Sequence, residues 1–352
     1  MAEDKKREKK KTIYDIASEA GVSPATVSRV LSNSGYPVRE SVRRKILSTA
    51  ERLNYSPNII GRMLKKSEST DIGVIIPTIS NPFYSQVVLG IELEARKRGY
   101  SVLLCNSFRD SETEKKYIRY LYQKQVGGII LPNIEEDHPF IKEMQGGGLR
   151  LAAFEQYSAG LGGIKIGFDY EKGVQLAVEH LIAMGHRNIA FLSAPLHKKS
   201  RIEMLEGYKG TLSRHGIPLD EGRIILSETE EEYDNGSYEF ENGKRLAAGF
   251  MELKMRPTAI FAINDITAIG IIQELSNNGV NVPEDVSVVG FDNIEFSSMS
   301  NPPLTTVNQP SYEIGKLACR MLIDSIIDGN QDSASIKYQP TLVVRKSVKN
   351  MN

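Results

Sequence analysis

Residues 12–31, TIYDIASEAGVSPATVSRVL, set the fold at the start of the chain. Thr12 and Asp15 have the spacing of a helix-capping pair, and apolar residues follow them at helical intervals. A Ser-Pro pair after the glycine-containing turn is typical of the start of a second helix. The stretch therefore predicts two short helices joined by a tight turn. The apolar spacing beyond it predicts a third helix over residues 40–53.

A helix-turn-helix of this kind can place its second helix in the major groove of DNA. Pro24 and Ala25 offer small apolar surface that suits the methyl group of thymine. Arg29, one turn further along, can donate two parallel hydrogen bonds to guanine. Thr26 and Ser28 are better suited to phosphate contacts, which set register. The alternative is a three-helix scaffold whose outer face is solvated.

The charge of the chain is unevenly distributed. Residues 1–70 carry 15 Lys and Arg against 8 Asp and Glu, a net charge of +7. The other 282 residues carry 29 against 36, a net charge of −7. A basic head on an acidic body favours a polyanionic partner for the head. A solvated tail is the favoured explanation for the lysines of residues 5–11 alone, but the cations from Arg29 to Lys66 lie within patterned segments.

After Asp71 short apolar segments alternate with longer helical patterns. This alternation predicts doubly wound parallel sheets of an α/β body. About 280 residues are too many for one such sheet, so we expect two similar lobes, with a first crossing between them over residues 157–172. The expected strands are Ile72–Ile76, Ser101–Cys105, Gly128–Leu131, Arg150–Phe154, Ile189–Leu192, Ile224–Leu226, Ala259–Ile263 and Val286–Gly290.

Composition and motifs disfavour several classes of protein. No apolar run approaches the ~18 residues of a membrane span, and no apolar core of a signal peptide follows the basic start. Cys105 and Cys319 are 214 residues apart and form no metal or redox motif, which fits a reducing cytosol. The sequence lacks GxxxxGK[ST], GxSxG, HExxH and GxGxxG, and its 5 histidines show no metal-ligand spacing. We therefore expect a cytoplasmic protein, associated with the nucleoid when bound, that is not an enzyme and has no catalytic residues, cofactor or metal.

Several long segments, in a fixed order, carry a resemblance to a known family. They are TIYDIASEAGVSPATVSRVL, NYSPN, GVIIPTISNPFY, EHLIAMGHRNIAFL, AINDITAIG, VPEDVSVVGFDN and PPLTTVNQP. With these segments the chain resembles the lactose-repressor (LacI/GalR) family of bacterial transcription regulators along nearly its whole length. The resemblance implies an all-α helix-turn-helix DNA-binding domain. It also implies a two-lobed body of the periplasmic-binding-protein type, with two doubly wound parallel sheets.

The resemblance further implies a hinge helix over residues 57–66 that forms on the operator. Leu64 would then enter the minor groove as an apolar wedge, with Asn58 and Arg62 beside it; a dimer or core contact is its alternative role. Gly61 departs from the family, in which alanine is more common, and glycine lowers helix stability by roughly 0.5–1 kcal/mol. The expected DNA-binding residues are Thr12, Ser23, Pro24, Ala25, Thr26, Ser28, Arg29, Asn33, Tyr55, Asn58, Arg62 and Leu64.

Ligands of open parallel sheets bind beyond the carboxyl ends of the strands, where this sequence places several polar residues. Asn264 and Asp292 follow expected strands, and their paired donors and acceptors suit the hydroxyls of a sugar. Asp265 is better explained as a helix N-cap, and Phe83 as either a ligand contact or a core residue. The resemblance makes Tyr238 a ring that stacks on the ligand. The expected effector-binding residues are Asn81, Phe83, Tyr84, Gln156, Asp169, Arg201, Tyr238, Asn264 and Asp292.

The body departs from the family at one ligand-gripping position. Many relatives have an arginine three residues before the glycine of a Gly-Tyr or Gly-Trp pair, and this chain has Met204 there. Either Arg201, one turn earlier, replaces it, with Lys198 or Lys199 as substitutes, or the grip is missing. An anionic or conventional hexose effector is therefore less favoured.

The sequence also predicts a domain organisation. It comprises a helix-turn-helix domain over residues 1–56, a hinge and linker over 57–70, an N-terminal lobe over 71–169 and 309–333, and a C-terminal lobe over 170–308 and 334–352. Since one helix-turn-helix reads one half-site, and two wedges are needed at the centre, we expect a homodimer on a palindromic operator.

Together these features predict a transcription regulator, a repressor under allosteric control by a small effector that is a sugar or sugar derivative. The expected partners are operator DNA, the effector and a second copy of the chain, with no membrane. Two alternatives stay within the family, a nucleobase-responsive regulator and a carbon-catabolite regulator whose co-repressor is a phosphorylated carrier protein. For the latter, residues 300–303, SNPP, lack an arginine for the phosphoserine. A solute-binding protein of the periplasmic type is a third alternative, disfavoured by the basic head.

Overall fold

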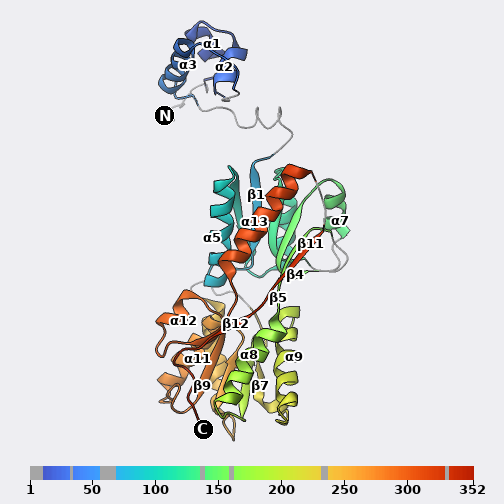
Figure 1. The fold of residues 1–352 in the computed structure, drawn as a ribbon, viewed down its shortest axis with the longest axis vertical. Coiled ribbons are helices and arrows are strands. Elements are labelled where there is room, and N and C mark those ends of the chain that lie inside the picture. Colours follow the sequence, from blue (N-terminus) through green and yellow to red (C-terminus); the bar gives the residue numbers. More distant parts are fainter. Residues whose placement is uncertain are drawn as a thin grey trace, which may run out of the picture. The chain divides into compact units, whose positions relative to one another are not determined.

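The computed structural model describes residues 11–31, 35–55, 69–134, 139–157, 162–230, 237–329 and 333–352. The chain divides into two compact units, Met1–Glu68 and Ser69–Asn352, which are the head and the body (Figure 1). In the part of the chain that the structure describes, no helix is long and apolar enough to span a bilayer.

The head is built from three short helices, α1 (Ile13–Ala20), α2 (Pro24–Leu31) and α3 (Glu40–Arg52). The amide of Thr12 donates to Asp15 Oδ2 over 2.6 Å, so the predicted pair does cap α1. The apolar positions of the three helices meet in one core of Ile16, Ala17, Ala20, Val27, Val30, Ile46 and Ala50. The predicted helix-turn-helix and third helix are confirmed.

The first lobe of the body is a parallel sheet in the order β11-β5-β4-β3-β1-β2. Its elements are β1 (Asp71–Ile76), α5 (Pro82–Lys97), β2 (Ser101–Asn106), α6 (Ser111–Gln123), β3 (Gly128–Ile134), α7 (Pro139–Gly146), β4 (Leu151–Tyr157), β5 (Ile164–Phe168), α13 (Ser311–Asp328) and β11 (Ala334–Tyr338). Alternate strand residues face opposite sides, so α5 and α13 share one core with the sheet and α6 and α7 share the other.

The second lobe repeats this plan with a sheet in the order β12-β10-β9-β8-β6-β7, parallel except for the edge strand β12. Its elements are α8 (Tyr170–Ala183), β6 (Ile189–Ser193), α9 (Lys199–Arg214), the 3-10 turn η1 (Glu221–Arg223), β7 (Ile224–Leu226), α10 (Tyr238–Met251), β8 (Ala259–Ala262), α11 (Asp265–Asn277), β9 (Ser287–Asp292), α12 (Glu295–Met299), β10 (Thr305–Asn308) and β12 (Thr341–Val343). The predicted fold class of two doubly wound lobes is confirmed.

The chain passes between the lobes after β5, after β10 and after β11. The sequence predicts residues 334–352 in the C-terminal lobe, which is wrong for residues 334–338. Ala334 of β11 pairs with Ile164 of β5 in the first sheet, so the last crossing follows Tyr338. β11 is mostly exposed at its sheet edge, which leaves it without the apolar alternation that marks a strand.

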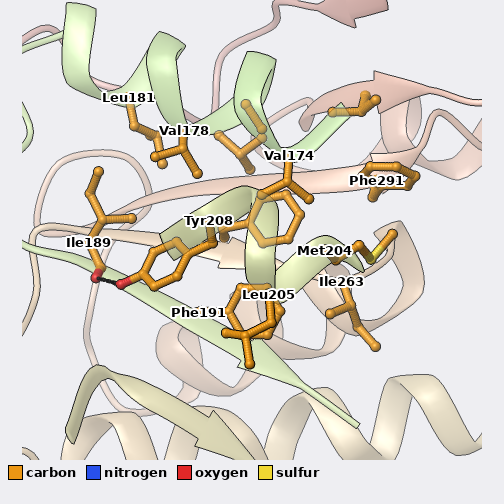
Figure 2. Packing of buried hydrophobic residues seen from close by; sticks show 14 of the residues in the cluster. Val174, Val178, Leu181, Ile189, Phe191, Met204, Leu205, Tyr208, Ile263 and Phe291 are labelled. Carbon is orange, nitrogen blue, oxygen red and sulfur yellow. Dashed lines mark hydrogen bonds between the residues drawn. The ribbon is translucent and has the colours of Figure 1, made fainter. Parts of the chain in front are cut away.

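An apolar cluster beneath α8 and α9 anchors the part of the second lobe that carries the candidate site (Figure 2). Tyr208 of α9 is buried in it, and its hydroxyl donates to the carbonyl oxygen of Ile189 over 2.9 Å. Met204, one helical turn earlier, packs in the same cluster. This packing fixes the start of α9, where Lys198 and Arg201 lie.

Candidate functional site

The outer surface of α2 is the candidate DNA-reading surface of the head. Ala25 and Arg29 are exposed and lie one turn apart on it. The hydroxyl oxygen of Ser23 accepts from the amide of Thr26 over 3.1 Å and lies 2.8 Å from the Thr26 hydroxyl. These two residues therefore cap α2 and fix its entry, while the exposed side chains remain available to DNA.

Tyr36, in the segment between α2 and α3, was not singled out from the sequence. The residue is 51% exposed, and the Arg29 guanidinium carbon lies 4.1 Å from the centroid of its ring. Such a stack limits the conformations of the arginine. A lone tyrosine in a connecting segment carries no sequence signal for this role.

The structure describes some of the other predicted DNA-binding residues and not the rest. Pro24 and Ser28 are half-buried on α2. Tyr55 packs against the head core, and its amide donates to the Ala50 carbonyl oxygen over 2.9 Å. Outside the described residues lie Asn33, Asn58, Arg62 and Leu64, as does Gly61 of the expected hinge helix.

A cavity of about 70 Å³ lies between the two lobes, at the carboxyl ends of their strands. It is small beside the roughly 300–1,000 Å³ of pockets for drug-sized ligands. The first lobe contributes Asn81, Phe83, Tyr84, Arg109 and Glu155 to its wall, and the second contributes Tyr170, Lys198, Ser200, Arg201, Met204, Glu239, Ile263, Asn264, Asp292 and Gln309.

The structure brings together six of the nine residues expected to bind the effector. At this cavity lie Asn81, Phe83, Tyr84, Arg201, Asn264 and Asp292. Asp169 is not at its wall, because its carboxylate accepts from the Lys172 amide as the cap of α8 and pairs with Lys337. Tyr238 is not at the wall either, since it is only 1% exposed and donates its hydroxyl hydrogen to Thr229 O over 2.7 Å. The side chain of Gln156 lies outside the described part of the chain.

The structure corrects the expected cap of α11. Asn264 caps this helix, accepting from the Thr267 amide over 2.8 Å, whereas Asp265 is the cap expected from the sequence. Asp265 is fully buried and accepts from the Thr306 hydroxyl at 2.5 Å and the Ile294 amide at 2.9 Å. Asparagine and aspartate are both common N-cap residues, so the residue type does not decide between them. Only the contacts of Asp265 with Ile294 and Thr306, which are distant in sequence, distinguish the two.

Polar and charged contacts join the two lobes across the cavity. Arg109, in the segment after β2, donates Nη1 to Glu230 Oε1 over 2.8 Å and also pairs with Glu239. Asn81 Nδ2 donates to Glu239 Oε1 over 2.9 Å. Phe108 and Arg109 both have left-handed backbone conformations, with φ of 53° and 61°. A non-glycine residue at positive φ is strained, so this turn is held in place by its surroundings.

Glu230 stands at the centre of the charged groups. Arg201 donates Nη1 to Glu230 Oε2 and Nη2 to Glu230 Oε1, each over 2.6 Å, and Lys198 Nζ lies 3.7 Å from Oε1. Burial alone would raise the pKa of Glu230, but the hydrogen bonds from Arg201 and the charges of Lys198, Arg201 and Arg109 lower it to about 2. Glu230 is therefore a firmly ionised carboxylate.

Two carboxyl groups at the cavity wall have pKa values shifted in the opposite direction from that of Glu230. Burial raises the pKa of Glu155, and the charge of Lys198 offsets this only in part. Burial also raises the pKa of Asp292 well above its ordinary value. Asp292 ends β9 with a φ of 108°, a strained conformation that resembles the strain found at binding sites. A protonated carboxyl can donate as well as accept a hydrogen bond, which suits hydroxyl-bearing ligands.

Asp265 predicts a pH dependence of folding stability. Burial raises its pKa from an ordinary 3.8 to about 7, so the folded protein holds a proton that the unfolded chain releases between these pH values. The free energy of unfolding is therefore expected to fall as pH rises from 4 to 7, by at most ~1.4 kcal/mol per pH unit. Asp265→Asn keeps an acceptor for the Ile294 amide and should lose this part of the pH dependence. Denaturant titrations at several pH values would measure it, and parallel curves for both proteins would contradict it.

A helix-turn-helix head joined to a two-lobed body with a polar interlobe cavity defines a class, that of DNA-binding proteins with a small-molecule-binding domain. Residues 12–58 match the bacterial regulatory proteins of the lacI family, and residues 178–348 match the periplasmic binding protein-like domain. The chain belongs to the LacI family of bacterial regulatory proteins.

Its relatives are transcription regulators of similar length. The chain is 37% identical to catabolite control protein A of Priestia megaterium, over 96% of this chain and 99% of the relative. It is 33% identical to the ribose operon repressor of Escherichia coli (strain K12), over 96% and 99%. The body and head are similar to the lac repressor dimer bound to operator and the anti-inducer ONPF, with a TM-score of 0.81 and 29% identity over 97% of this chain and 100% of that one.

Proposed function

We propose that this protein is a transcriptional repressor that binds a palindromic operator as a homodimer and is controlled by a small molecule in the interlobe cavity. The observation that carries the proposal is a cavity with walls from both lobes, because a ligand there contacts both and biases their relative angle. The lac repressor structure, a dimer on its operator with a bound small molecule, supports the same arrangement here. We further propose that the protein acts in the cytoplasm, on the nucleoid, and is not an enzyme.

A sugar or sugar derivative is the proposed class of effector. Asn264, Asn81 and Asp292 bring amide and carboxyl groups to the cavity, and such groups match the adjacent hydroxyls of a sugar. The related ribose operon repressor supports this class. A nucleobase is the alternative ligand class, since the same groups can pair with a heterocycle.

Dimerisation is proposed through the edge of the first sheet. Leu103 and Leu104 of the edge strand β2 are 36% and 41% exposed, and Leu89 and Leu93 of α5 are exposed as well. Apolar side chains at an open sheet edge favour association. Leu104→Lys is expected to raise the dimer dissociation constant at least about tenfold, because a charge would be desolvated in the interface. Sedimentation analysis would measure this, with Leu219→Lys, at an exposed leucine of the other lobe, as the control.

The relative named catabolite control protein A favours a second candidate, a regulator with a phosphorylated carrier protein as co-repressor. Residues 300–303 offer no cation for a phosphoserine. The nearby Arg345 already donates to Leu304 O over 2.7 Å and to Asn293 Oδ1 over 2.6 Å. We therefore expect a pull-down with the phosphorylated carrier to recover none of this protein, and specific recovery would favour the second candidate.

The proposed function is tested by coupling ligand binding to operator binding. Operator sequences would first be selected from random duplexes, and sugars, sugar phosphates, nucleosides and nucleobases screened by thermal shift. A ligand at 100 times its dissociation constant should stabilise the fold by about 2.7 kcal/mol. The same ligand should also change the affinity for the operator. Asp292→Ala should abolish this change, whereas the control Asp328→Ala, at an exposed carboxylate, should not. A ligand that leaves operator affinity unchanged would contradict allosteric control.

A further inference from the structure

We infer that Arg109, Lys198 and Arg201, three cations at the wall of the cavity, form an anion site occupied by the chain's own Glu230, and that the effector carries a carboxylate or phosphate group that takes this place. The inference rests on the proposed function and adds the charge of the ligand to it. Its basis is a cradle of three cations, Arg109, Lys198 and Arg201, around the carboxylate of Glu230, with Arg109 also paired with Glu239.

The cradle has the geometry of an anion site. Arg201 presents both terminal nitrogens to the two oxygens of Glu230 at 2.6 Å, the fork arrangement by which arginine binds carboxylates and phosphates. Its Nη1 also donates to Pro195 O over 2.8 Å, which holds the guanidinium in position. Arg109 approaches from the first lobe, with Nη1 2.8 Å from Oε1. An anion held there is thus bound by both lobes.

The cations of the cradle are costly to bury without an anion. The side chains of Arg109 and Arg201 are 6% and 10% exposed, and that of Glu230 is 10% exposed. Among the described residues, three carboxyls line the cavity itself. Glu155 and Asp292 have raised pKa values and offset less of the positive charge, whereas the charge of Arg109 lowers the pKa of Glu239 against the effect of burial, so Glu239 balances one of the three cations. A phosphate or carboxylate ligand would supply the negative charge that buried cations need.

The start of α9 supplies a second, independent observation. Lys198 is its N-cap residue and makes no side-chain cap hydrogen bond, and the first turn contains no acidic residue. Cations at a helix N-terminus are unfavourable for the helix, since the helix dipole and free amides there favour anions. Basic residues at this end are therefore poor helix-stabilising choices, but they are well suited to a bound anion.

Glu230 is placed to leave the cradle. It lies beyond β7 in a connecting segment, outside any helix or strand, whereas Arg201 belongs to α9. Exchange of this carboxylate for a ligand anion therefore requires no helix or strand to unfold. Because Asn264 and Asp292 line the same cavity, the matching ligand is a polyhydroxy acid or sugar phosphate, with its hydroxyls toward these residues.

The anion site is tested without knowledge of the natural effector by removing its occupant. Glu230→Ala should lower the melting temperature of the full chain, and inorganic phosphate or acetate should restore it. The rise in melting temperature on adding the anion should be at least about 2 °C larger for Glu230→Ala than for wild type at matched ionic strength. Glu228→Ala, at an exposed carboxylate of the same segment, should respond as wild type does. Glu230→Gln, which keeps the shape of the side chain, serves if the alanine variant does not fold.

The restoration must depend on the cradle. Arg201→Ala in the Glu230→Ala background should lose the specific response to phosphate and acetate. The anion site is overturned if Glu230→Ala and Glu230→Gln respond to these anions no more than Glu228→Ala does.

The ligand class is tested with matched pairs, glucuronate against glucose and ribose 5-phosphate against ribose. We expect wild type to bind an acidic member and not its neutral partner, and Glu230→Ala to bind it about tenfold or more tightly because the internal competitor is gone. Binding of neutral sugars alone, with a change in operator affinity, would overturn this inference and leave the proposed function intact. Loss of every ligand effect on operator affinity would instead contradict the proposed function.

Discussion

Alanine at Gly243 is expected to destabilise the body by about 3 kcal/mol or more, because overpacking between two backbones has no flexible neighbour to absorb it. Gly243 of α10 lies against α11, and an added Cβ would overlap the carbonyl oxygen of Thr267 and approach the Ile271 amide nitrogen to 3.0 Å. Gly270 of α11 lies in the same way against the Phe240 carbonyl oxygen. The two helices must therefore separate. Denaturant unfolding of the full chain would measure the loss.

The same substitution should weaken effector binding, because α10 and α11 both begin at the cavity. Glu239 lies in the first turn of α10, and Asn264 caps α11. Gly210→Ala is the matched control, since Gly210 lies in the helix α9 with no atom within 4 Å of its added Cβ. That change should raise the free energy of unfolding by roughly 0.5–1 kcal/mol. Equal stabilities of the two alanine variants would contradict the backbone-contact argument.

The local patterns of the sequence were sufficient to predict the head, the two lobes and the ends of several strands. They succeeded where one feature dominates, as at β1 and β8, which are continuous apolar runs followed by polar residues. They failed at β5, a strand of alternating buried and half-buried residues that lies within residues 157–172, the predicted crossing between the lobes. They failed also at β11, whose pairing partner lies 170 residues earlier in the chain.

The charged contacts at the cavity could not be predicted from local sequence patterns either, because their partners are also far apart in the chain. Arg109 contacts Glu230 and Glu239 across 121 and 130 residues, and neither acid belongs to a recognisable motif. The departure at Met204 did direct attention to Arg201 and Lys198, and both lie at the cavity wall. The sequence does not identify Glu230 as their partner, because it lies in a connecting segment without a motif and only the folded chain brings it beside them. Tyr238, expected at the cavity from the family resemblance, is not at its wall, because its hydroxyl donates to the carbonyl oxygen of Thr229 instead.

Arg29→Ala is expected to weaken binding to the selected operator by about 1–3 kcal/mol, or roughly 5- to 150-fold, and to relax specificity at one base pair. Arg29 is exposed on α2, and stacking on Tyr36 restricts the conformations of its guanidinium group in the free protein. Tyr36→Ala should therefore produce a smaller loss in the same direction, while Tyr36→Phe keeps the ring and should be near neutral. Fluorescence anisotropy on the operator and on its single-base variants would measure both properties.

Arg29→Lys separates base reading from charge, because lysine keeps the cation but loses the planar fork. It should retain binding to random duplex and the dependence of affinity on salt, yet lose preference for the operator. Arg44→Ala is the control for charge alone, since Arg44 is an exposed cation of α3 paired only loosely, at 3.4 Å, with Glu40. If Arg29→Ala instead weakens all duplexes equally, as a phosphate contact would, Arg29 sets register rather than sequence, and the bases must be read by other side chains of α2.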